Sequence, residues 1–296
     1  MTKPKINLES PIINLAVDLY KKNVHSALQN TPSIVEDAVI PIYAIPKRKA
    51  HQKPKTKPEQ IGSGVLVKIK DYYFIFTATH VMLEHIGKPI FTGDGNGTKL
   101  QEIHGEIFNS GKPQSPLDNP YDAAVFHLHS ELSESLKKVA IGIDDLDESE
   151  LDKDFPIIMA CGFRIKMSNT AGDQITGMRE VFPSIEVDLA DYKRLNIDPK
   201  SHLIISYEDQ VLVNQKWQTS PIPRGLSGGG LIKFKGTNIK ELTKPVNDAT
   251  QLLSAITIEH YRDKGGKLGV LIGTRINVHL GLIAQLLPDA LEGILK

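Results

Sequence analysis

The chain has 296 residues, and its 35 lysine and arginine residues balance its 35 aspartate and glutamate residues, so its formal net charge is zero at pH 7. It lacks the basic field by which proteins attract nucleic acid, and no apolar run reaches the roughly 20 residues of a membrane span, so we expect neither nucleic acid nor a membrane as its partner. Cys161 is the only cysteine, which excludes an internal disulfide and the usual cysteine zinc clusters. We therefore expect no metal and no cofactor.

The first elements predicted are a helix and a strand. Residues 11–28 carry apolar side chains at nearly helical spacing, which predicts an N-terminal helix. Residues 37–45 are typical of a strand, in which Pro41 indicates an edge position or a bulge. Residues 47–58 are rich in lysine and contain two prolines, so we expect a solvated loop. A basic recognition arm is the alternative for this segment.

A hairpin and two further strands follow. Residues 62–69 and 72–77 form the predicted hairpin, which brings His80 to the end of its second strand. Residues 91–110 are strand-like but interrupted by glycines, and Asp122 opens the strand predicted over 123–128. His127 and His129 alternate along that strand, which would suit a metal pair, but no further ligand stands at a recognisable spacing.

The second half begins after an acidic run, residues 144–154, which we expect to be a surface connection. A calcium loop is the alternative, but the spacing of its ligands is absent. Many short β-rich runs separated by turn residues argue for a barrel. These runs are residues 156–160, 180–187, 203–207, 230–234, 252–258 and 267–272. Residues 277–296 return to helical spacing.

Three short motifs supply groups for nucleophilic catalysis. Thr77–His80 ends in an imidazole, Tyr121–Val125 contains the carboxylate of Asp122, and Gly225–Gly229 holds Ser227 in a turn of glycines. Asp122 follows His80 by 42 positions, and Ser227 follows Asp122 by 105. A serine hydroxyl needs a neighbouring base to attack a carbonyl at neutral pH, and a carboxylate orients that base.

In these motifs, and in Ile61–Val67 and Ala160–Phe163, the chain resembles the chymotrypsin-like (trypsin-type) serine proteases over about residues 36–285. With its single cysteine it is most similar to intracellular, bacterial-type members. The resemblance implies an all-β dominated fold of two packed six-stranded antiparallel β-barrels with an N-terminal and a C-terminal helix. It implies three parts: a helical extension (1–35), a first barrel with His80 and Asp122 (36–150), and a second barrel with Ser227 and the C-terminal helix (151–296).

The resemblance also implies roles for the residues. His80 is expected to be the general base, Asp122 its orienting carboxylate, and Ser227 the nucleophile of a serine endopeptidase that forms an acyl-enzyme. The amides of Gly225 and Ser227 are expected to form the oxyanion hole. Asp118 competes with Asp122 for its role, but only Asp122 directly precedes the strand. Ser254 is expected to support Asp122 from behind.

The substrate pocket implied by the resemblance includes Pro221, Ala255, Ile256, Thr257 and Glu259. Pro221 stands near the place where trypsin-type members carry a pocket aspartate, which gives no support for lysine or arginine preference. Glu259 could restore that charge, although a solvated glutamate at a strand end is the alternative.

Regulation and localisation are also inferred. Leu226 replaces the aspartate that some members use to bind a newly cut N-terminus, so we expect control by a regulatory protein partner, a ligand or the N-terminal helix. Residues 1–10 lack the apolar core of a signal peptide, and together with the single cysteine this predicts a cytoplasmic protein.

Three alternative functions remain at this stage. Gly225–Gly229 also satisfies the nucleophile motif of α/β-hydrolases, but that fold needs the order serine, acid, histidine. An esterase-type serine hydrolase would use the same three side chains as the protease. An inactive binding module on the protease fold would keep the barrels and lose the chemistry. The expected partner is a protein or peptide substrate.

Overall fold

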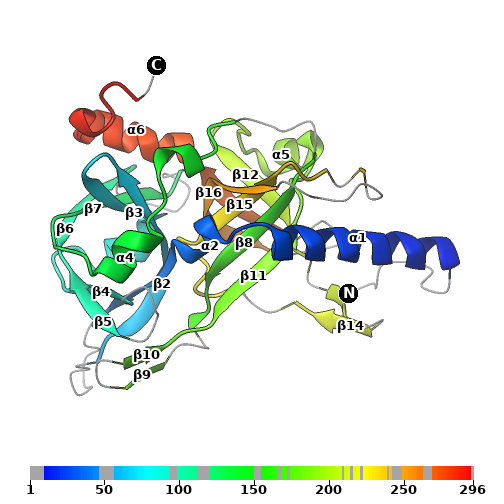
Figure 1. Cartoon of the computed structure of the whole chain (residues 1–296), viewed down its shortest axis with the longest axis horizontal. Helices are drawn as coiled ribbons and strands as arrows, with labels where there is room; N and C mark the ends of the chain where they lie inside the picture. The colour runs from blue at the N-terminus through cyan, green and yellow to red at the C-terminus, as the bar shows by residue number, and fades with distance from the viewer. Residues whose placement is uncertain are drawn as a thin grey trace.

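The computed structural model describes residues 10–46, 57–93, 99–111, 121–149, 155–165, 169–171, 174–208, 210–213, 216–220, 223–238, 240–241, 249–262 and 269–294. The basic segment 47–56, the end of the acidic run (150–154), Asp118 and Pro221 lie outside these residues. Two antiparallel sheets dominate the fold, with α1 and α6 at the two ends of the chain (Figure 1).

The helices and strands fall into two halves. The first half contains α1 (Pro11–Asn30), α2 (Ile34–Asp37), β1 (Val39–Ala44), β2 (Glu59–Ile69), β3 (Tyr72–Ala78), α3 (Thr79–Leu83), β4 (Ile90–Gly93), β5 (Leu100–Ile103), β6 (Gly105–Asn109), β7 (Ala123–Leu128), α4 (Glu134–Val139) and η1 (Ile143–Asp145). The second half contains β8 (Ile157–Phe163), β9 (Asn169–Ala171), β10 (Gln174–Thr176), β11 (Arg179–Ser184), α5 (Leu189–Leu195), β12 (His202–Ser206), β13 (Gln210–Val213), β14 (Lys216–Thr219), β15 (Gly230–Lys235), β16 (Thr250–Tyr261), β17 (Val270–Arg275), α6 (Ile276–Leu286) and η3 (Pro288–Ala290).

The first sheet has the strand order β5-β4-β1-β2-β3-β7-β6. The strands at its two edges, β5 and β6, are consecutive in the chain and separated only by His104. Residues 100–109 therefore pair with β4 through β5 and with β7 through β6, and the bend at His104 closes the sheet. The seven strands of this sheet thus correspond to the six-stranded barrel that the sequence predicted, with one strand bent into two.

The second sheet has the order β11-β8-β15-β16-β17-β12. The chain that follows β11 turns toward the other edge, where the Val187 amide donates to the Ile204 carbonyl (3.0 Å) and the Ser206 amide to the Ile185 carbonyl (3.3 Å). These bonds join the two edge strands, so the six-stranded second barrel is confirmed. Because the strand pairings in both sheets are antiparallel, the α/β-hydrolase alternative is wrong.

The structure also confirms individual strand predictions. The strand expected over 123–128 is β7, and the predicted hairpin is β2 and β3, which turn at Lys70 with a φ of 52°. Pro41 lies in β1 between two neighbouring strands, not at an edge. The register of β1 against β2 shifts one residue later, between Ile42 and Tyr43. Pro41 therefore lies next to a bulge.

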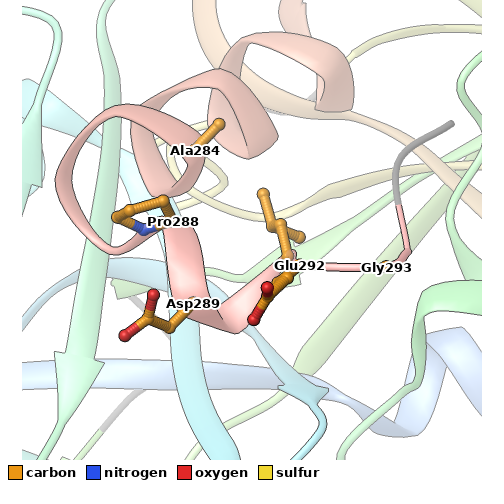
Figure 2. Close-up of a pocket in the computed structure, with 6 residues that line it drawn as sticks. Ala284, Pro288, Asp289, Glu292 and Gly293 are labelled. Carbon is orange, nitrogen blue, oxygen red and sulfur yellow. The ribbon is translucent and has the colours of Figure 1, made fainter.

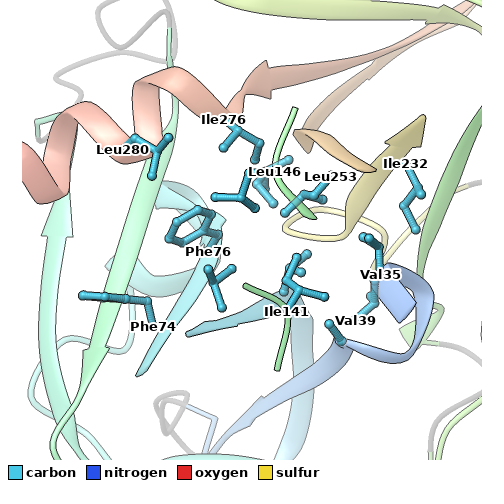
Figure 3. Packing of buried hydrophobic residues seen from close by; sticks show 14 of the residues in the cluster. Val35, Val39, Phe74, Phe76, Ile141, Leu146, Ile232, Leu253, Ile276 and Leu280 are labelled. Atoms are coloured by element: carbon cyan, nitrogen blue, oxygen red, sulfur yellow. The ribbon is translucent and has the colours of Figure 1, made fainter. Parts of the chain in front are cut away.

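One hydrophobic core joins the two barrels. It contains Phe74 and Phe76 from the first sheet, Ile232 and Leu253 from the second, and Leu280 from α6 (Figure 3). All five side chains are buried. Groups carried by different barrels therefore lie in a fixed arrangement, which a site between the barrels requires.

The two terminal helices differ in their environment. α6 packs its buried face, including Ile276 and Ile283, into the common core. Figure 1 shows α1 crossing in front of the second sheet and extending beyond it, and only its later turns, with Val24 and Ala27, reach the core. None of the helices in the described parts of the chain combines the length and the apolar character needed to cross a membrane.

The acidic connection between the barrels is not wholly on the surface. The Asp147 side chain is buried, and its carboxylate accepts hydrogen bonds from Ser149 Oγ (2.6 Å), Ser254 Oγ (2.6 Å) and Lys233 Nζ (3.1 Å). Ser254 therefore binds Asp147 instead of Asp122, which corrects the role inferred for it. The physical reason is the ammonium of Lys233, which is buried within β15 and needs a negative partner.

Asp147→Asn is expected to destabilise the fold by about 3 to 5 kcal/mol, because it removes the charge of the carboxylate that binds the buried Lys233 ammonium. Burial alone would raise the pKa of Asp147, but the bonds from Ser149, Ser254 and Lys233 outweigh it and lower the pKa. The stabilisation is therefore complete above the ordinary aspartate pKa of about 3.9 and is lost as pH falls below it.

Urea denaturation at pH 7 and at low pH measures this prediction. Asp144→Asn is the matched control, since Asp144 is exposed in the same connection, and should change stability by less than about 0.5 kcal/mol. Equal stabilities of the two variants at pH 7 would contradict the prediction.

Candidate active site

His80 and Asp122 are joined by two hydrogen bonds. His80 lies in the first turn of α3, immediately after β3 ends. Its Nδ1 is 2.5 Å from Asp122 Oδ2, and its backbone amide donates to Asp122 Oδ1 over 2.9 Å. Both carboxylate oxygens therefore bind the same residue, which fixes the imidazole ring relative to its own backbone.

The backbone around Asp122 explains this geometry. Asp122 precedes β7 with a φ of 45°, a left-handed conformation that aspartate tolerates better than most residues. The Thr79 amide donates to the Asp122 carbonyl (2.8 Å) and Thr79 Oγ1 to the Ala123 carbonyl (2.7 Å). The start of α3 and the start of β7 are thus held together, and the side chain of Asp122 is directed at His80.

The bond at Nδ1 decides what the other ring nitrogen can do. A carboxylate accepts hydrogen bonds, so Nδ1 of neutral His80 carries the proton. Nε2 then has a free lone pair and can take a proton. The His80 side chain is 47% exposed, so this nitrogen is open to a reacting group.

The four carbonyls from Arg224 to Ser227, in the turn around Ser227, are all bound. The Arg224 carbonyl accepts from the Ile165 amide (3.1 Å), the Leu226 carbonyl from the Gly229 amide (2.8 Å), and the Ser227 carbonyl from the Ser63 amide (2.9 Å). The Gly225 carbonyl accepts from Ser63 Oγ over 2.8 Å. A planar peptide with a fixed carbonyl has a fixed N–H on its other side.

Two amides of the same turn have no acceptor. The Leu226 and Gly228 amides donate to the Pro223 carbonyl (3.3 Å) and the Thr257 carbonyl (2.7 Å). In the part of the chain that the structure describes, the Gly225 and Ser227 amides donate to no protein oxygen. These two are the amides that the sequence assigned to an oxyanion hole.

Glycine is required at two places in this turn. Gly225 has a φ of 100°, and a Cβ there would lie 2.4 Å from the Phe163 carbonyl oxygen. Gly228 has a φ of 82°, and a Cβ there would lie 2.0 Å from the Ser63 carbonyl oxygen. Both positions combine a left-handed backbone with close approach to another strand, which only glycine allows.

The serine turn and the histidine segment meet at Gly62. A Cβ on Gly62 would lie 2.7 Å from Val81 Cγ1 and 3.0 Å from the Ser227 carbonyl oxygen, so both segments pack against this glycine. Among the described residues, Ser227 Oγ has no hydrogen bond to the His80 ring. Such bonds are often long in unliganded enzymes and shorten when substrate binds.

Of the four predicted pocket residues that the structure describes, only Glu259 is exposed. Ala255 and Ile256 have no exposed surface and pack in the barrel core, and Thr257 is also buried. The side chains of these three residues therefore do not reach a substrate. The backbone of Thr257 instead supports the serine turn, since its amide donates to the Gly229 carbonyl (2.8 Å).

Glu259 lies at the edge of the site. The Tyr261 hydroxyl donates to its carboxylate, and the charges of both Asp122 and His80 act on it. Burial raises the pKa of Glu259, Asp122 raises it further, and Tyr261 and His80 lower it. Across the described ranges no lysine or arginine forms an ion pair with Glu259.

His279 supports the histidine segment from α6, a role that no motif in the sequence indicated. Its ring is buried, stacks on Phe76 at a centroid distance of 5.3 Å, and lies with Nε2 3.2 Å from the Thr77 carbonyl. Burial lowers the pKa of His279 to about 4, against the opposing effects of its hydrogen bonds and of Asp122. It is therefore a neutral side chain at pH 7.

Two other features lie apart from this site. A pocket of about 330 Å³ lies between α6 and the chain that follows it. Figure 2 shows Asp289 and Glu292 at its wall. The pocket contains none of the residues described above. His127 and His129 lie together, with ring nitrogens 3.2 Å apart, but no third potential metal ligand joins them among the described residues.

Comparison with known proteins adds a structural relative. No protein-family model matches the sequence, and no curated protein matches it. The structure is similar to that of neuropsin, described as a serine protease expressed in the limbic system of mouse brain, with a TM-score of 0.53 and 13% sequence identity. The similarity covers 86% of this chain and 96% of the neuropsin chain. This chain therefore has the trypsin-like, double β-barrel fold of the chymotrypsin-like serine proteases.

Proposed function

We propose that the protein is a serine endopeptidase that cleaves peptide bonds with His80, Asp122 and Ser227. The observation that carries this proposal is the double hydrogen bond between His80 and Asp122, which leaves Nε2 of His80 able to accept a proton. The Ser227 turn packs against Gly62, which also contacts Val81, the residue after His80. The two unused amides of that turn support the same chemistry.

In the proposed mechanism, Ser227 Oγ attacks the carbonyl carbon of the scissile peptide and its proton moves to His80 Nε2. The carbonyl oxygen becomes negative and accepts hydrogen bonds from the Gly225 and Ser227 amides. His80 then gives the proton to the leaving amine, and an acyl group remains on Ser227. Water, deprotonated by His80, releases the acyl group as a carboxylate. Asp122 stabilises the imidazolium throughout.

A peptide library with mass-spectrometric detection tests the proposed function. Wild-type protein should generate new N-termini, and Ser227→Ala should generate none. Cleavage of ester substrates without any cleavage of peptides would favour the esterase alternative. Full cleavage by Ser227→Ala would overturn the proposal.

A catalytically inactive binding module on the same fold is the second candidate. It is favoured by one observation, the missing hydrogen bond between Ser227 and His80 within the described residues. Tight binding of peptides by the wild-type protein, without cleavage, would support it over the endopeptidase.

The switch and the location of the enzyme are further parts of the proposal. Leu226 is buried among apolar residues, so the position before Ser227 offers no carboxylate to a newly cut N-terminus. We propose that a protein partner or ligand controls the enzyme, instead of cleavage of its chain. We also propose that it functions in a reducing compartment such as the cytoplasm, because proteins there rarely contain disulfides.

Glu259→Gln is expected to lower kcat/KM about tenfold for peptides that place a lysine or arginine next to the scissile bond, because it removes a charged acceptor that has no basic partner among the described residues. Peptides with neutral side chains there should be cleaved by both forms at rates within about threefold. The preference should also weaken as pH falls through the raised pKa of Glu259, since protonation removes its charge.

Paired peptide substrates that differ only in lysine against norleucine measure this prediction. Glu241→Gln is a suitable control, because Glu241 lies in the exposed turn after β15. An unchanged ratio between the two substrates in Glu259→Gln would show that Glu259 is an ordinary solvated side chain.

A further inference from the structure

Ser63 connects the first barrel to the serine turn of the second. It lies in β2 and has no exposed surface. Its Oγ donates to the Gly225 carbonyl (2.8 Å) and accepts from the Phe163 amide (2.9 Å). Its own amide donates to the Ser227 carbonyl (2.9 Å). Ser63 therefore binds two carbonyls of the serine turn and the backbone of β8 at its last residue.

The position of Ser63 is itself fixed. Thr77 Oγ1 donates to the Ser63 carbonyl over 2.8 Å. Thr77 lies near the end of β3, three residues before His80, which follows in α3. A chain of hydrogen bonds thus runs from the histidine segment through Ser63 to the serine turn, and every bond in it joins buried groups.

The bond to the Gly225 carbonyl matters because of the backbone there. The amides of Gly225 and Ser227 belong to the peptide units on either side of the unit that carries the Gly225 carbonyl. Glycine at a φ of 100° offers little intrinsic resistance to rotation of that unit. The two flanking units are held by their carbonyls, and the unit between them is held by the Ser63 hydroxyl (2.8 Å) and by the longer bond of the Leu226 amide to the Pro223 carbonyl (3.3 Å). Loss of the hydroxyl would let this middle unit rotate, which changes the orientation of the two amides relative to each other.

We propose that Ser63 is a positioning residue for the oxyanion hole. It touches no substrate, and it acts by keeping the Gly225 and Ser227 amides aimed at the developing negative oxygen. This inference rests on the proposed endopeptidase function and goes beyond it, because it assigns a requirement of catalysis to the other barrel. It also means that the oxyanion hole depends on how the two barrels dock.

The chain provides a matched control at the other end of β8. Thr237 is buried, and its Oγ1 accepts from the Ile157 amide (2.8 Å) and donates to the Phe234 carbonyl (2.6 Å). Ser63 makes the same two kinds of bond, one of them to Phe163 at the opposite end of the strand. Thr237→Ala therefore removes an equivalent buried hydroxyl away from the serine turn.

The experiment compares Ser63→Ala with Thr237→Ala in the full chain, using a peptide substrate and a peptide aldehyde, which forms a tetrahedral adduct with its oxygen in the hole. Ser63→Ala is expected to lower kcat at least tenfold, with KM within about threefold, and to raise the aldehyde Ki by a similar factor. Thr237→Ala should leave kcat, KM and Ki within about threefold of the wild type. The melting temperatures of both variants should fall.

Each outcome is decisive. Wild-type kcat and Ki in folded Ser63→Ala, or equal losses in the two variants, would overturn the positioning role while leaving the endopeptidase proposal intact. If Ser63→Ala does not fold, Ser63→Cys replaces it, since a thiol is only a weak donor and acceptor, and wild-type kcat and Ki in that variant would overturn the role. Wild-type protein that hydrolyses no peptide would overturn the endopeptidase proposal itself, and the role with it.

Discussion

His80→Ala is expected to lower kcat for peptide hydrolysis by about 10⁶, to the small rate that binding and the oxyanion amides alone sustain. The reason is that Ser227 then has no base to take its proton, and a serine hydroxyl is a poor nucleophile at pH 7. The substrate should still bind, because the loss concerns the reacting step.

Steady-state kinetics on purified protein measures the effect, with circular dichroism to verify folding. His25→Ala is the control, since His25 is an exposed residue of α1, and it should retain full activity. A His80→Ala protein with more than about 1% of the wild-type kcat would show that another group acts as the base.

Asp122→Asn is expected to lower kcat by about 10⁴. Asparagine has the same shape as aspartate and tolerates the left-handed φ of 45°, so the backbone of the site should not change. Its side-chain amide, however, donates a hydrogen bond to His80 Nδ1 where the carboxylate accepted one. The proton of neutral His80 then moves to Nε2, and the ring can no longer accept the proton of Ser227.

The measurement is again kcat, together with the thermal midpoint, which should change little. Asp144→Asn makes the same chemical change at an exposed position and should leave kcat unchanged. If Asp122→Asn loses less than tenfold in kcat, the 2.5 Å bond between His80 and Asp122 has no part in setting the tautomer.

The strands were the most predictable part of the fold. A strand such as β7, in which five of the six residues are small or apolar, shows its own limits in the sequence. Closure of the first barrel could not be predicted in the same way, because it depends on a bend at His104 that brings β5 and β6 to opposite edges. That property belongs to the whole sheet and to no local pattern.

The sequence analysis missed the four short helices α2, α3, α4 and α5, although the starts of two of them are marked. Asp188 caps α5 by accepting from the Ala190 and Asp191 amides, and Ser133 caps α4 by accepting from the Leu136 amide. Both residues are typical N-caps. The helices they begin have seven and six residues, too short for a hydrophobic period to stand out.

The functional residues were also only partly predictable from the sequence. His80 and Asp122 were identified from short motifs, and the structure brings their side chains together. The roles of Asp147 and Ser254 were misjudged, because an aspartate within an acidic run gives no sign that its side chain is buried. The one available signal was Lys233, a charged residue within the otherwise apolar strand β15.

Ser63 shows why some functional residues stay hidden. Its neighbours along the chain are two glycines, which suggest only close packing. Its importance comes from Gly225 and Phe163, which are 162 and 100 residues away in sequence. Contacts of that range become visible only when the barrels are docked.

A fluorophosphonate probe tests most directly whether His80 activates Ser227. Intact wild-type protein should take up one probe molecule, peptide mapping should locate it on Ser227, and His80→Ala should react at least about 10³-fold more slowly. A wild-type protein that stays unlabelled, a label on another serine, or equal labelling rates in wild type and His80→Ala would contradict the proposed chemistry.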